Sequence, residues 1–176
     1  MWWSCKSTEN YGKTSNLIIG DLDSVNDEIK NKYSDKIINI ENQDDNDFRK
    51  SLDWISKNLT IEKLFILGAT GLREDHAIGN LMTFLYQKFN FNIEIITNKG
   101  IFYIVNYKQT IKTSIGQYAS IFSIDIKQKI TTNGLKYELN NASLDTLYSG
   151  TLNTCQNTEM TIQTNSEKPL LVYLAY

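Results

Sequence analysis

The spacing of apolar residues changes partway along the chain, and this change most constrains how the sequence can fold. Up to about residue 90, short apolar runs alternate with segments whose apolar residues recur every three or four positions. From about Asn92 the helical spacing is lost, and short strand-like segments follow one another. This change predicts an α/β segment followed by an all-β segment.

The first segment contains three short apolar runs that we expect to be strands, at 17–19, 36–40 and 63–67. One helix is expected to begin near Asp45 and another to follow His76, because apolar residues recur there at helical intervals. Alternating strands and helices favour a parallel sheet with crossover connections. Ligands of such sheets bind at the carboxyl ends of the strands.

The second segment is divided by turn residues. A turn at 98–100 is expected to join two strands, and the pair Asn133-Gly134 predicts a two-residue type I′ hairpin turn with positive φ at both residues. Further strands are expected at 118–124, 160–163 and 170–176. We therefore expect a parallel-sheet α/β domain at 1–98 and an antiparallel β-sandwich domain at 99–176.

Composition excludes several classes of protein. The chain has 176 residues, 41% hydrophobic, with one proline, which is typical of a folded globular protein. A formal net charge of −2 disfavours nucleic acid as a partner. The apolar runs are shorter than the roughly 20 residues of a membrane-spanning helix. With no membrane span and no recognisable secretory signal, we expect a cytoplasmic protein.

Two cysteines, Cys5 and Cys155, are far apart in the sequence and lack a CxxC spacing. This pattern favours two reduced thiols over a zinc site or a disulfide framework.

The first group of chemically active side chains follows the first expected strand. Asp21 and Asp23 point the same way if the segment is extended, so they can bind one hard cation, and Gly20 permits a tight backbone turn. The alternative is an acidic turn in which Ser24 caps the following helix.

A second acidic group stands at the start of the next helix. Asp44 and Asp47 are three residues apart and face one way. Helix capping is the alternative for Asp44 and Asp45, because acidic residues favour a helix N-terminus.

The third strand leads into a glycine loop. Gly68 and Gly71 precede a helix N-terminus, which is a usual place for a phosphate group, and Arg73 can clamp a phosphate with two hydrogen bonds. Three strands therefore deliver acids or phosphate-binding groups to one expected sheet edge. This combination indicates metal-assisted phosphoryl chemistry on a nucleotide.

The helix that follows the glycine loop begins with further polar residues. Asp75 can hold a metal or accept a proton, while His76 and Asn80 lie on one face of the first helical turn. A lone histidine at a helix start is more often a structural hydrogen-bonding group.

These segments resemble, in order, the motifs of the thiamine pyrophosphokinase family. GDLDS at 20–24 is similar to its Gly-Asp-Phe-Asp-Ser motif, and QDDNDF at 43–48 to its Lys-Asp-x-Thr-Asp-Phe motif. GATGLREDHAIGN at 68–80 is the most specific match, to Gly-Ala-x-Gly-Gly-Arg-x-Asp-His-x-x-x-Asn. In the second half, TTNGLKYEL at 131–139 and GTLN at 150–153 resemble the family's hairpin and its Ser-Thr-Ser-Asn stretch.

The resemblance implies an ATP-binding α/β domain and a thiamine-binding β-sandwich in a homodimer, with thiamine held where the subunits meet. It implies transfer of pyrophosphate from ATP to the thiamine hydroxyl, which gives thiamine diphosphate and AMP. Two alternatives remain open: a related pyrophosphokinase that acts on another alcohol, such as a hydroxymethyl pterin, and a thiamine-binding remnant without catalysis.

The resemblance also implies roles for individual residues. Asp21, Asp23 and Asp47 correspond to Mg²⁺ and substrate-positioning ligands, Arg73 to the phosphate clamp, and Asp75 to a metal- or proton-handling residue. Residues assigned to binding of the nucleotide or thiamine are Asp44, Gly68, Gly71, His76, Asn80, Thr151 and Asn153.

Several positions depart from the family pattern, namely Gln43, Asn46, Leu72 and Leu152, in place of Lys, Thr, Gly and Ser. Family members also begin with a strand and an Ala-Asp-Gly-Gly-Ala loop that the first sixteen residues do not resemble. Roughly forty residues, or one βα unit, are therefore expected to be missing, against about thirty for a crossover unit. We expect such a chain to keep its β-sandwich and to bind ATP weakly.

Overall fold

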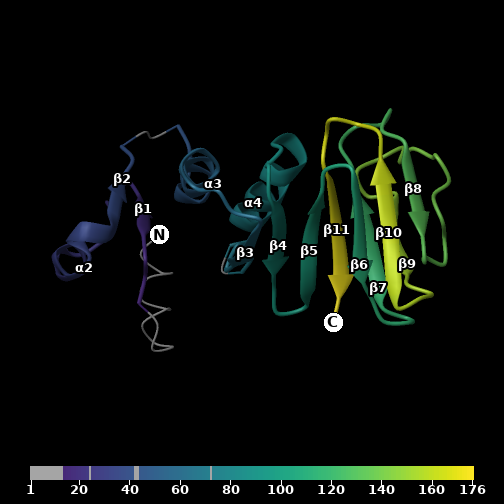
Figure 1. Ribbon diagram of the computed structural model, residues 1–176, viewed down its shortest axis with the longest axis horizontal. Helices are drawn as coiled ribbons and strands as arrows, with labels where there is room; N and C mark the ends of the chain where they lie inside the picture. The colour runs from purple at the N-terminus through teal and green to yellow at the C-terminus, as the bar shows by residue number, and fades with distance from the viewer. Residues whose placement is uncertain (1–13, 24, 42–43, 72) are drawn as a thin grey trace. The chain divides into compact units, whose positions relative to one another are not determined.

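The computed structural model describes residues 14–23, 25–41, 44–71 and 73–176 of the chain (Figure 1). The chain consists of two compact units, Met1–Thr60 and Ile61–Tyr176. The expected boundary near residue 98 falls inside the second unit, within a hairpin. None of the helices in the described ranges is both long enough and apolar enough to cross a membrane.

The first unit is a small α/β structure. Its strands β1 (Ile18–Gly20) and β2 (Ile37–Asn39) pair in parallel, with Ile18 opposite Ile37. Between them lie helix α2 (Asp27–Lys32) and the 3₁₀ turn η1 (Ser34–Lys36), and helix α3 (Asp47–Asn58) lies against β1. A small core forms from Ile18, Val25, Ile29 and Tyr33.

Asparagine side chains cap the two helices described in this unit, α2 and α3. The Oδ1 atom of Asn26 accepts a hydrogen bond from the backbone N–H of Ile29 at 2.9 Å, so the first helix is capped by Asn26. Ser24, the expected cap, lies outside the described residues. Asn46 caps α3 in the same way, with 2.9 Å to the N–H of Arg49. Asn and Thr both serve as helix caps, so the Asn46 departure preserves this structural role.

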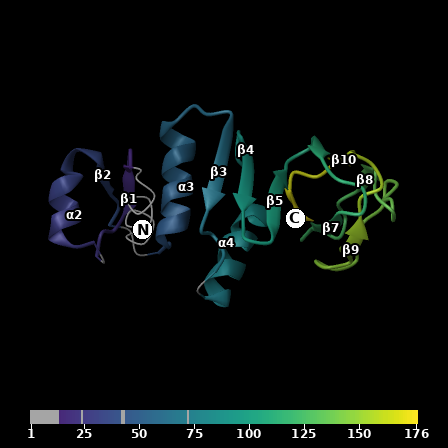
Figure 2. The same ribbon diagram turned by 90° about the horizontal axis from the view of Figure 1, so that it is seen from below.

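The second unit contains a mixed six-stranded sheet and a three-stranded antiparallel sheet. The six-stranded sheet has the order β3 (Lys63–Leu67), β4 (Asn92–Ile96), β5 (Gly100–Val105), β11 (Leu170–Ala175), β7 (Tyr118–Phe122) and β9 (Gly150–Thr154). The smaller sheet has the order β6 (Lys108–Lys112), β10 (Glu159–Thr164) and β8 (Ile130–Asn133). Helix α4 (Glu74–Tyr86) connects β3 to β4 and contacts β11 (Figure 2).

Parallel pairing occurs in two separate sheets. The strands β1 and β2 form a parallel pair in the first unit, whereas β3 and β4 form the parallel edge of the six-stranded sheet. That sheet continues beyond β4 because β4 and β5 pair antiparallel around the turn expected at 98–100. The hydroxyl oxygen of Thr97 holds this turn by accepting from the N–H groups of Lys99 and Gly100 at 3.2 and 3.1 Å. The parallel strands expected at 1–98 are thus divided between a two-stranded parallel sheet and the mixed six-stranded sheet.

The expected type I′ turn at Asn133-Gly134 is wrong. Only Gly134 has positive φ, at +99°, while Asn133 is the last residue of β8. The carboxylate of Glu138 accepts from the N–H groups of Gly134 and Leu135 at 2.6 and 2.8 Å and from the hydroxyl of Thr132 at 2.6 Å. The Glu138 side chain, which lies inside the loop, thus accepts hydrogen bonds from backbone N–H groups. In a two-residue turn, backbone groups would instead pair across the hairpin. The strand ends are joined instead by a wider loop.

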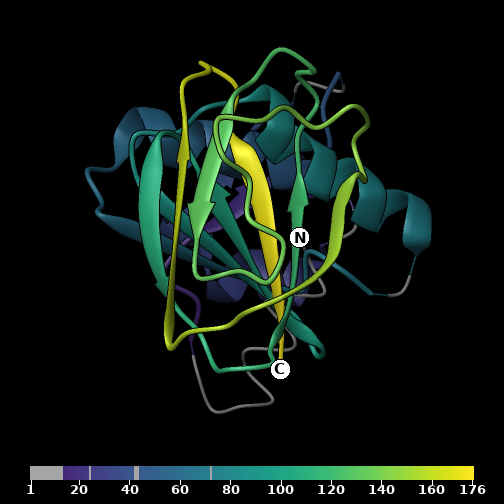
Figure 3. The same ribbon diagram turned by 90° about the vertical axis from the view of Figure 1, so that its right-hand side faces the viewer.

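The two sheets of the second unit enclose its main core (Figure 3). Fully buried members come from both sheets and include Ile121, Ile130, Met160, Ile162 and Val172. Cys155 is also buried there as a free thiol, and burial raises its pKa. Cys5 lies outside the described residues, so the expectation of two reduced thiols stays a prediction.

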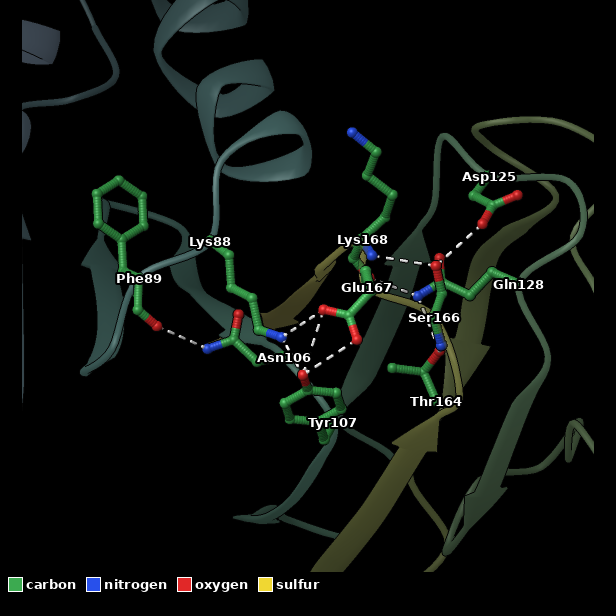
Figure 4. A network of polar contacts seen from close by, with 10 residues as sticks. All are labelled: Lys88, Phe89, Asn106, Tyr107, Asp125, Gln128, Thr164, Ser166, Glu167 and Lys168. Atoms are coloured by element: carbon green, nitrogen blue, oxygen red, sulfur yellow. Dashed lines mark hydrogen bonds and ion pairs between the residues drawn. The ribbon is translucent and has the colours of Figure 1, made fainter.

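A polar network holds the connections at one end of the second unit (Figure 4). The ammonium of Lys88, just after α4, donates to the Tyr107 hydroxyl and lies 3.0 Å from a carboxylate oxygen of Glu167. Nearby, the buried Gln128 side chain donates to the Thr164 hydroxyl at 2.8 Å. Contact with its partners raises the pKa of Lys88 and lowers that of Glu167. The Lys88 bonds join the loop after α4 to the loop between β5 and β6 and to the loop between β10 and β11.

Candidate active site

The acidic residues at the end of β1 and the start of α3 surround a buried lysine. The Nζ atom of Lys50 lies 3.0 Å from Oδ2 of Asp21 and 3.7 Å from Oδ1 of Asp47. The Lys50 side chain is 2% exposed, and the two carboxylates are 22% and 26% exposed. The structure therefore brings together two of the three predicted metal ligands around an internal cation.

Backbone contacts hold the two carboxylates in place. The N–H of Asp21 donates to Oδ1 of Asp47 at 3.3 Å, and the N–H of Asp23 donates to Oδ1 of Asp21 at 3.3 Å. A Cβ atom at position 20 would lie 2.8 Å from Oδ1 of Asp47, which is closer than such contacts allow. Gly20 is therefore required because it lets the Asp47 carboxylate approach the backbone of β1.

Electrostatics in this cluster follow from the ion pairs. The hydrogen bond from Lys50, followed by the one from the Asp23 backbone, lowers the pKa of Asp21. The same contact with Asp21 raises the pKa of Lys50. Both groups are therefore held in their charged forms at neutral pH.

Other acidic residues of the first unit are more exposed. Asp23 and Asp44 both lie at the surface, and no group of three His, Cys, Asp or Glu side chains in the described residues is arranged to hold a metal. Asp45 pairs with Arg49 at 2.6 Å, one helical turn away, which supports a helix-terminal role for Asp45. Gln43, where the family pattern has Lys, lies outside the described residues.

The glycine loop of the second unit follows β3 directly. Gly68 and Gly71 have φ angles of +73° and +112°, which favour glycine over other residues. The side-chain amide of Asn80, in α4, donates to the backbone oxygen of Ala69 at 3.0 Å. Asn80 therefore holds the loop from the helix, whereas Leu72 lies outside the described residues.

Arg73 and Asp75 form a two-bonded pair at the start of α4. The guanidinium atoms Nε and Nη2 lie 3.1 and 2.6 Å from the two carboxylate oxygens of Asp75. Asp75 also accepts from the N–H of His76 at 2.9 Å. The Arg73 guanidinium holds the pKa of Asp75 down at about 2. Both side chains are mostly exposed, and the His76 side chain is exposed beside them.

A cavity of about 350 Å³ adjoins the glycine loop. It is lined by Gly68, Gly71 and Thr70 from the loop, by Thr97 to Lys99 from the β4–β5 turn, and by Phe102 and Tyr173. The rings of Phe102 and Tyr173 lie 4.6 Å apart, and the Tyr173 hydroxyl donates to the backbone oxygen of Lys99 at 2.8 Å. The cavity is thus lined by an aromatic pair, by a turn that carries a lysine, and by the glycine loop.

Thr151 and Asn153, which were assigned to thiamine or nucleotide binding, both lie on β9. The Asn153 side chain is buried and bonds the backbone of Tyr137, while the Thr151 hydroxyl donates to the backbone oxygen of Tyr148 at 2.9 Å. Leu152, between them, has φ of +61° and is 85% exposed. Both predicted ligands therefore have structural hydrogen bonds, and the side chain between them faces solvent.

Sequence reasoning missed Lys50 and the aromatic side of the cavity. Lys50 lies on the polar side of α3, opposite Leu52, where the helical pattern gives no sign of burial. The available signal was its spacing of three residues from Asp47, which places both on one helix face. Phe102 and Tyr173 face each other across paired strands, a proximity that strand patterns alone do not reveal.

We expected three strands to bring their acidic and phosphate-binding residues to one sheet edge, and this stays a prediction. Asp21 and Asp47 belong to the first unit, whereas the glycine loop, Arg73, Asp75 and β9 belong to the second.

Comparison with known proteins finds two family models along the chain. Residues 5–97 match the model described as thiamin pyrophosphokinase, catalytic domain, and residues 100–173 match the thiamin pyrophosphokinase, substrate-binding domain. The two matches follow each other in order and together span most of the sequence.

Individual relatives agree with the family models. Thiamine pyrophosphokinase 3 of Oryza sativa subsp. japonica is 30% identical over 171 residues, and thiamine pyrophosphokinase 1 of the same plant is 28% identical over 171 residues. These alignments cover 86% and 88% of this chain but 63% and 64% of the relatives, so the chain spans less than two thirds of their length.

Solved structures show the same fold. Thiamine pyrophosphokinase from Bacillus subtilis superposes with a TM-score of 0.75 at 22% identity, covering 97% of this chain and 83% of that one. Thiamin pyrophosphokinase from Candida albicans gives a TM-score of 0.75 at 16% identity, covering 98% and 77%.

Proposed function

Because the chain belongs to the thiamin pyrophosphokinase family, we propose that it transfers pyrophosphate from ATP to the hydroxyl of thiamine, with AMP as the second product. The observation that carries this proposal is the ordered pair of matches to a catalytic and a substrate-binding domain. The same pair supports an ATP-binding part at 1–98 and a thiamine-binding part at 99–176. We also propose that the enzyme is cytoplasmic.

The acidic cluster of the first unit suits a hard cation by its donor chemistry. Asp21, Asp23 and Asp47 offer carboxylate oxygens, which are the ligands that Mg²⁺ prefers, and we propose them as its ligands. Bound Mg²⁺ would supply positive charge that offsets the charge of the phosphates. Lys50 lowers the pKa of Asp21 and pairs with both Asp21 and Asp47. We assign Asp44, just before α3, to the nucleotide.

The glycine loop and Arg73 are proposed to bind the phosphate chain of ATP. Backbone N–H groups of a glycine loop before a helix suit an anion, and a guanidinium can bind phosphate with two hydrogen bonds. Asp75 holds the Arg73 guanidinium in a defined orientation, with 2.6 Å between Nη2 of Arg73 and Oδ2 of Asp75. Asn80 keeps the loop in position, and we assign His76, next to the pair, to contact with the nucleotide.

The cavity beside the loop supports a ligand that carries both a ring and negative charge. Phe102 and Tyr173 provide apolar ring surface, and Lys99 provides a cation on the neighbouring turn. A volume of about 350 Å³ lies within the range of small-molecule sites.

For the second substrate, the exposed surface around β9 supports the proposal of a homodimer that binds thiamine. Leu152, Tyr137 and Tyr148 are 85%, 63% and 67% exposed, and the backbone oxygens of the two tyrosines accept from Asn153 and Thr151, which flank Leu152 on β9. Thr151 and Asn153 lie on the same strand. A second copy of the chain would cover these side chains and close a thiamine site against them.

The test is formation of AMP by the purified chain with ATP, Mg²⁺ and thiamine. We expect AMP and thiamine diphosphate to form in equal amounts, and no AMP with a hydroxymethyl pterin as the acceptor. AMP formed only with the pterin would overturn the choice of acceptor. Calorimetry that shows thiamine binding without any turnover would instead favour a binding protein without catalysis.

A further inference from the structure

We propose that Lys50 is a positioning residue whose buried ammonium occupies the cation position between Asp21 and Asp47. In the nucleotide-free protein, this internal cation would keep the acidic pair from binding a divalent ion tightly. The identity of that ion as Mg²⁺ rests on the proposed function, but the role of Lys50 rests on the geometry of the first unit.

Lys50 reaches both carboxylates from within the same small unit. Its Nζ atom lies 3.0 Å from Asp21 and 3.7 Å from Asp47, and its side chain is 2% exposed. A lysine this deeply buried is retained in a protein when its charge is paired. The ammonium is therefore a fixed component of the cluster and differs from a solvated surface charge.

The two carboxylates are equally fixed. Asp47 accepts from the backbone of Asp21, and the absence of a side chain at Gly20 permits that approach. Two carboxylates held this close repel each other unless a positive charge stands between them. Lys50 supplies one positive charge against two negative charges, and a divalent ion that approaches the pair is repelled by the ammonium already there.

Replacement of Lys50 by a neutral residue therefore has a specific consequence. The acidic pair keeps its backbone contacts but loses its internal cation, so a divalent ion becomes the best available counter-charge. A lysine with a purely structural role would lower stability on replacement without raising affinity for a metal.

The experiment measures binding of Mn²⁺ to the full chain without nucleotide, from the loss of the free Mn²⁺ signal in electron paramagnetic resonance. We expect Lys50→Met to bind Mn²⁺ at least tenfold more tightly than the wild-type chain. Lys50→Arg keeps the charge and should bind like the wild type. Lys57→Met is the matched control, because Lys57 pairs with Asp53 on the exposed side of the same helix.

Circular dichroism establishes that each variant is folded, and Lys50→Gln, which keeps a hydrogen-bond donor toward Asp21, replaces Lys50→Met if the latter unfolds. Asp21→Asn combined with the neutral variant should abolish the gain in Mn²⁺ affinity. Unchanged Mn²⁺ affinity in a folded neutral variant would overturn the inference. Since no ATP or thiamine is present, this result is independent of whether the chain forms AMP.

Discussion

Asn153 and Tyr137 are joined by two hydrogen bonds that run in opposite directions. The N–H of Tyr137 donates to Oδ1 of Asn153 at 3.1 Å, and Nδ2 of Asn153 donates to the backbone oxygen of Tyr137 at 2.7 Å. The amide side chain thus replaces a backbone partner for a residue that lies outside any strand. It links the two motifs of the second half of the sequence, GTLN and TTNGLKYEL.

The first prediction concerns this link. Asn153→Ala removes both hydrogen bonds to the backbone of Tyr137, so it should lower the free energy of unfolding by about 2 kcal/mol. Thr151→Val, on the same strand but at an exposed hydroxyl, should change it by less than about 1 kcal/mol. Urea denaturation of both variants measures the difference. Equal stability of the two would show that the Asn153 bonds do not hold the loop.

Much of the fold follows from local patterns in the sequence. The helices begin close to the expected residues because asparagine caps and apolar spacing are local signals, as with Asn46 at the start of α3. The β4–β5 turn was likewise predictable from residues 98–100. By contrast, β6 and β9 carry polar residues such as Lys108 and Thr154, so their sequences lack the apolar alternation that marks a strand.

The errors have a common physical cause, which is a side-chain contact that overrides a local pattern. Asn133-Gly134 is a strong hairpin signal, yet Glu138 binds the N–H groups of Gly134 and Leu135 and opens the loop. Lys50 lies on the polar side of α3, yet Asp21 from another element pairs with it and buries it. Lys50 and Asp21 are 29 positions apart, so their pairing cannot be inferred from one sequence alone.

The second prediction concerns the acidic cluster. Asp47→Asn should reduce turnover by a hundredfold or more, which corresponds to about 3 kcal/mol of transition-state stabilisation, while the fold persists. Asp45→Asn is the control, because Asp45 lies at the same helix start but pairs with Arg49, away from the Lys50 cluster. The rate of AMP formation and the melting temperature are measured for both. An unchanged rate with a lowered melting temperature would reject Asp47 as a metal ligand.

The third prediction concerns Arg73. Arg73→Lys keeps the charge but loses the planar fork, so AMP formation should fall at least tenfold while the melting temperature stays within about 2 °C. The small stability effect follows because the Arg73 and Asp75 side chains are 66% and 62% exposed. Lys57→Arg on α3, which exchanges the same two residue types outside the proposed site, should leave the rate unchanged. If Arg73→Lys formed AMP as fast as the wild type, Arg73 would be excluded as the phosphate clamp.

The last prediction concerns the ionisation of Asp75. Its pKa is lowered from 3.8 to about 2, chiefly by the hydrogen bonds from Arg73. Because folding lowers this pKa, the contact contributes to stability above about pH 3.8 and loses that contribution as the pH falls toward 2. Titration of the Asp75 side-chain carboxyl carbon by NMR should therefore give a midpoint near 2 in the wild-type chain and a higher midpoint, closer to 3.8, in Arg73→Met. If the Asp75 midpoint were the same in both chains, the two-bonded pair would be absent in solution, and Arg73 would be unrestrained before any phosphate arrives.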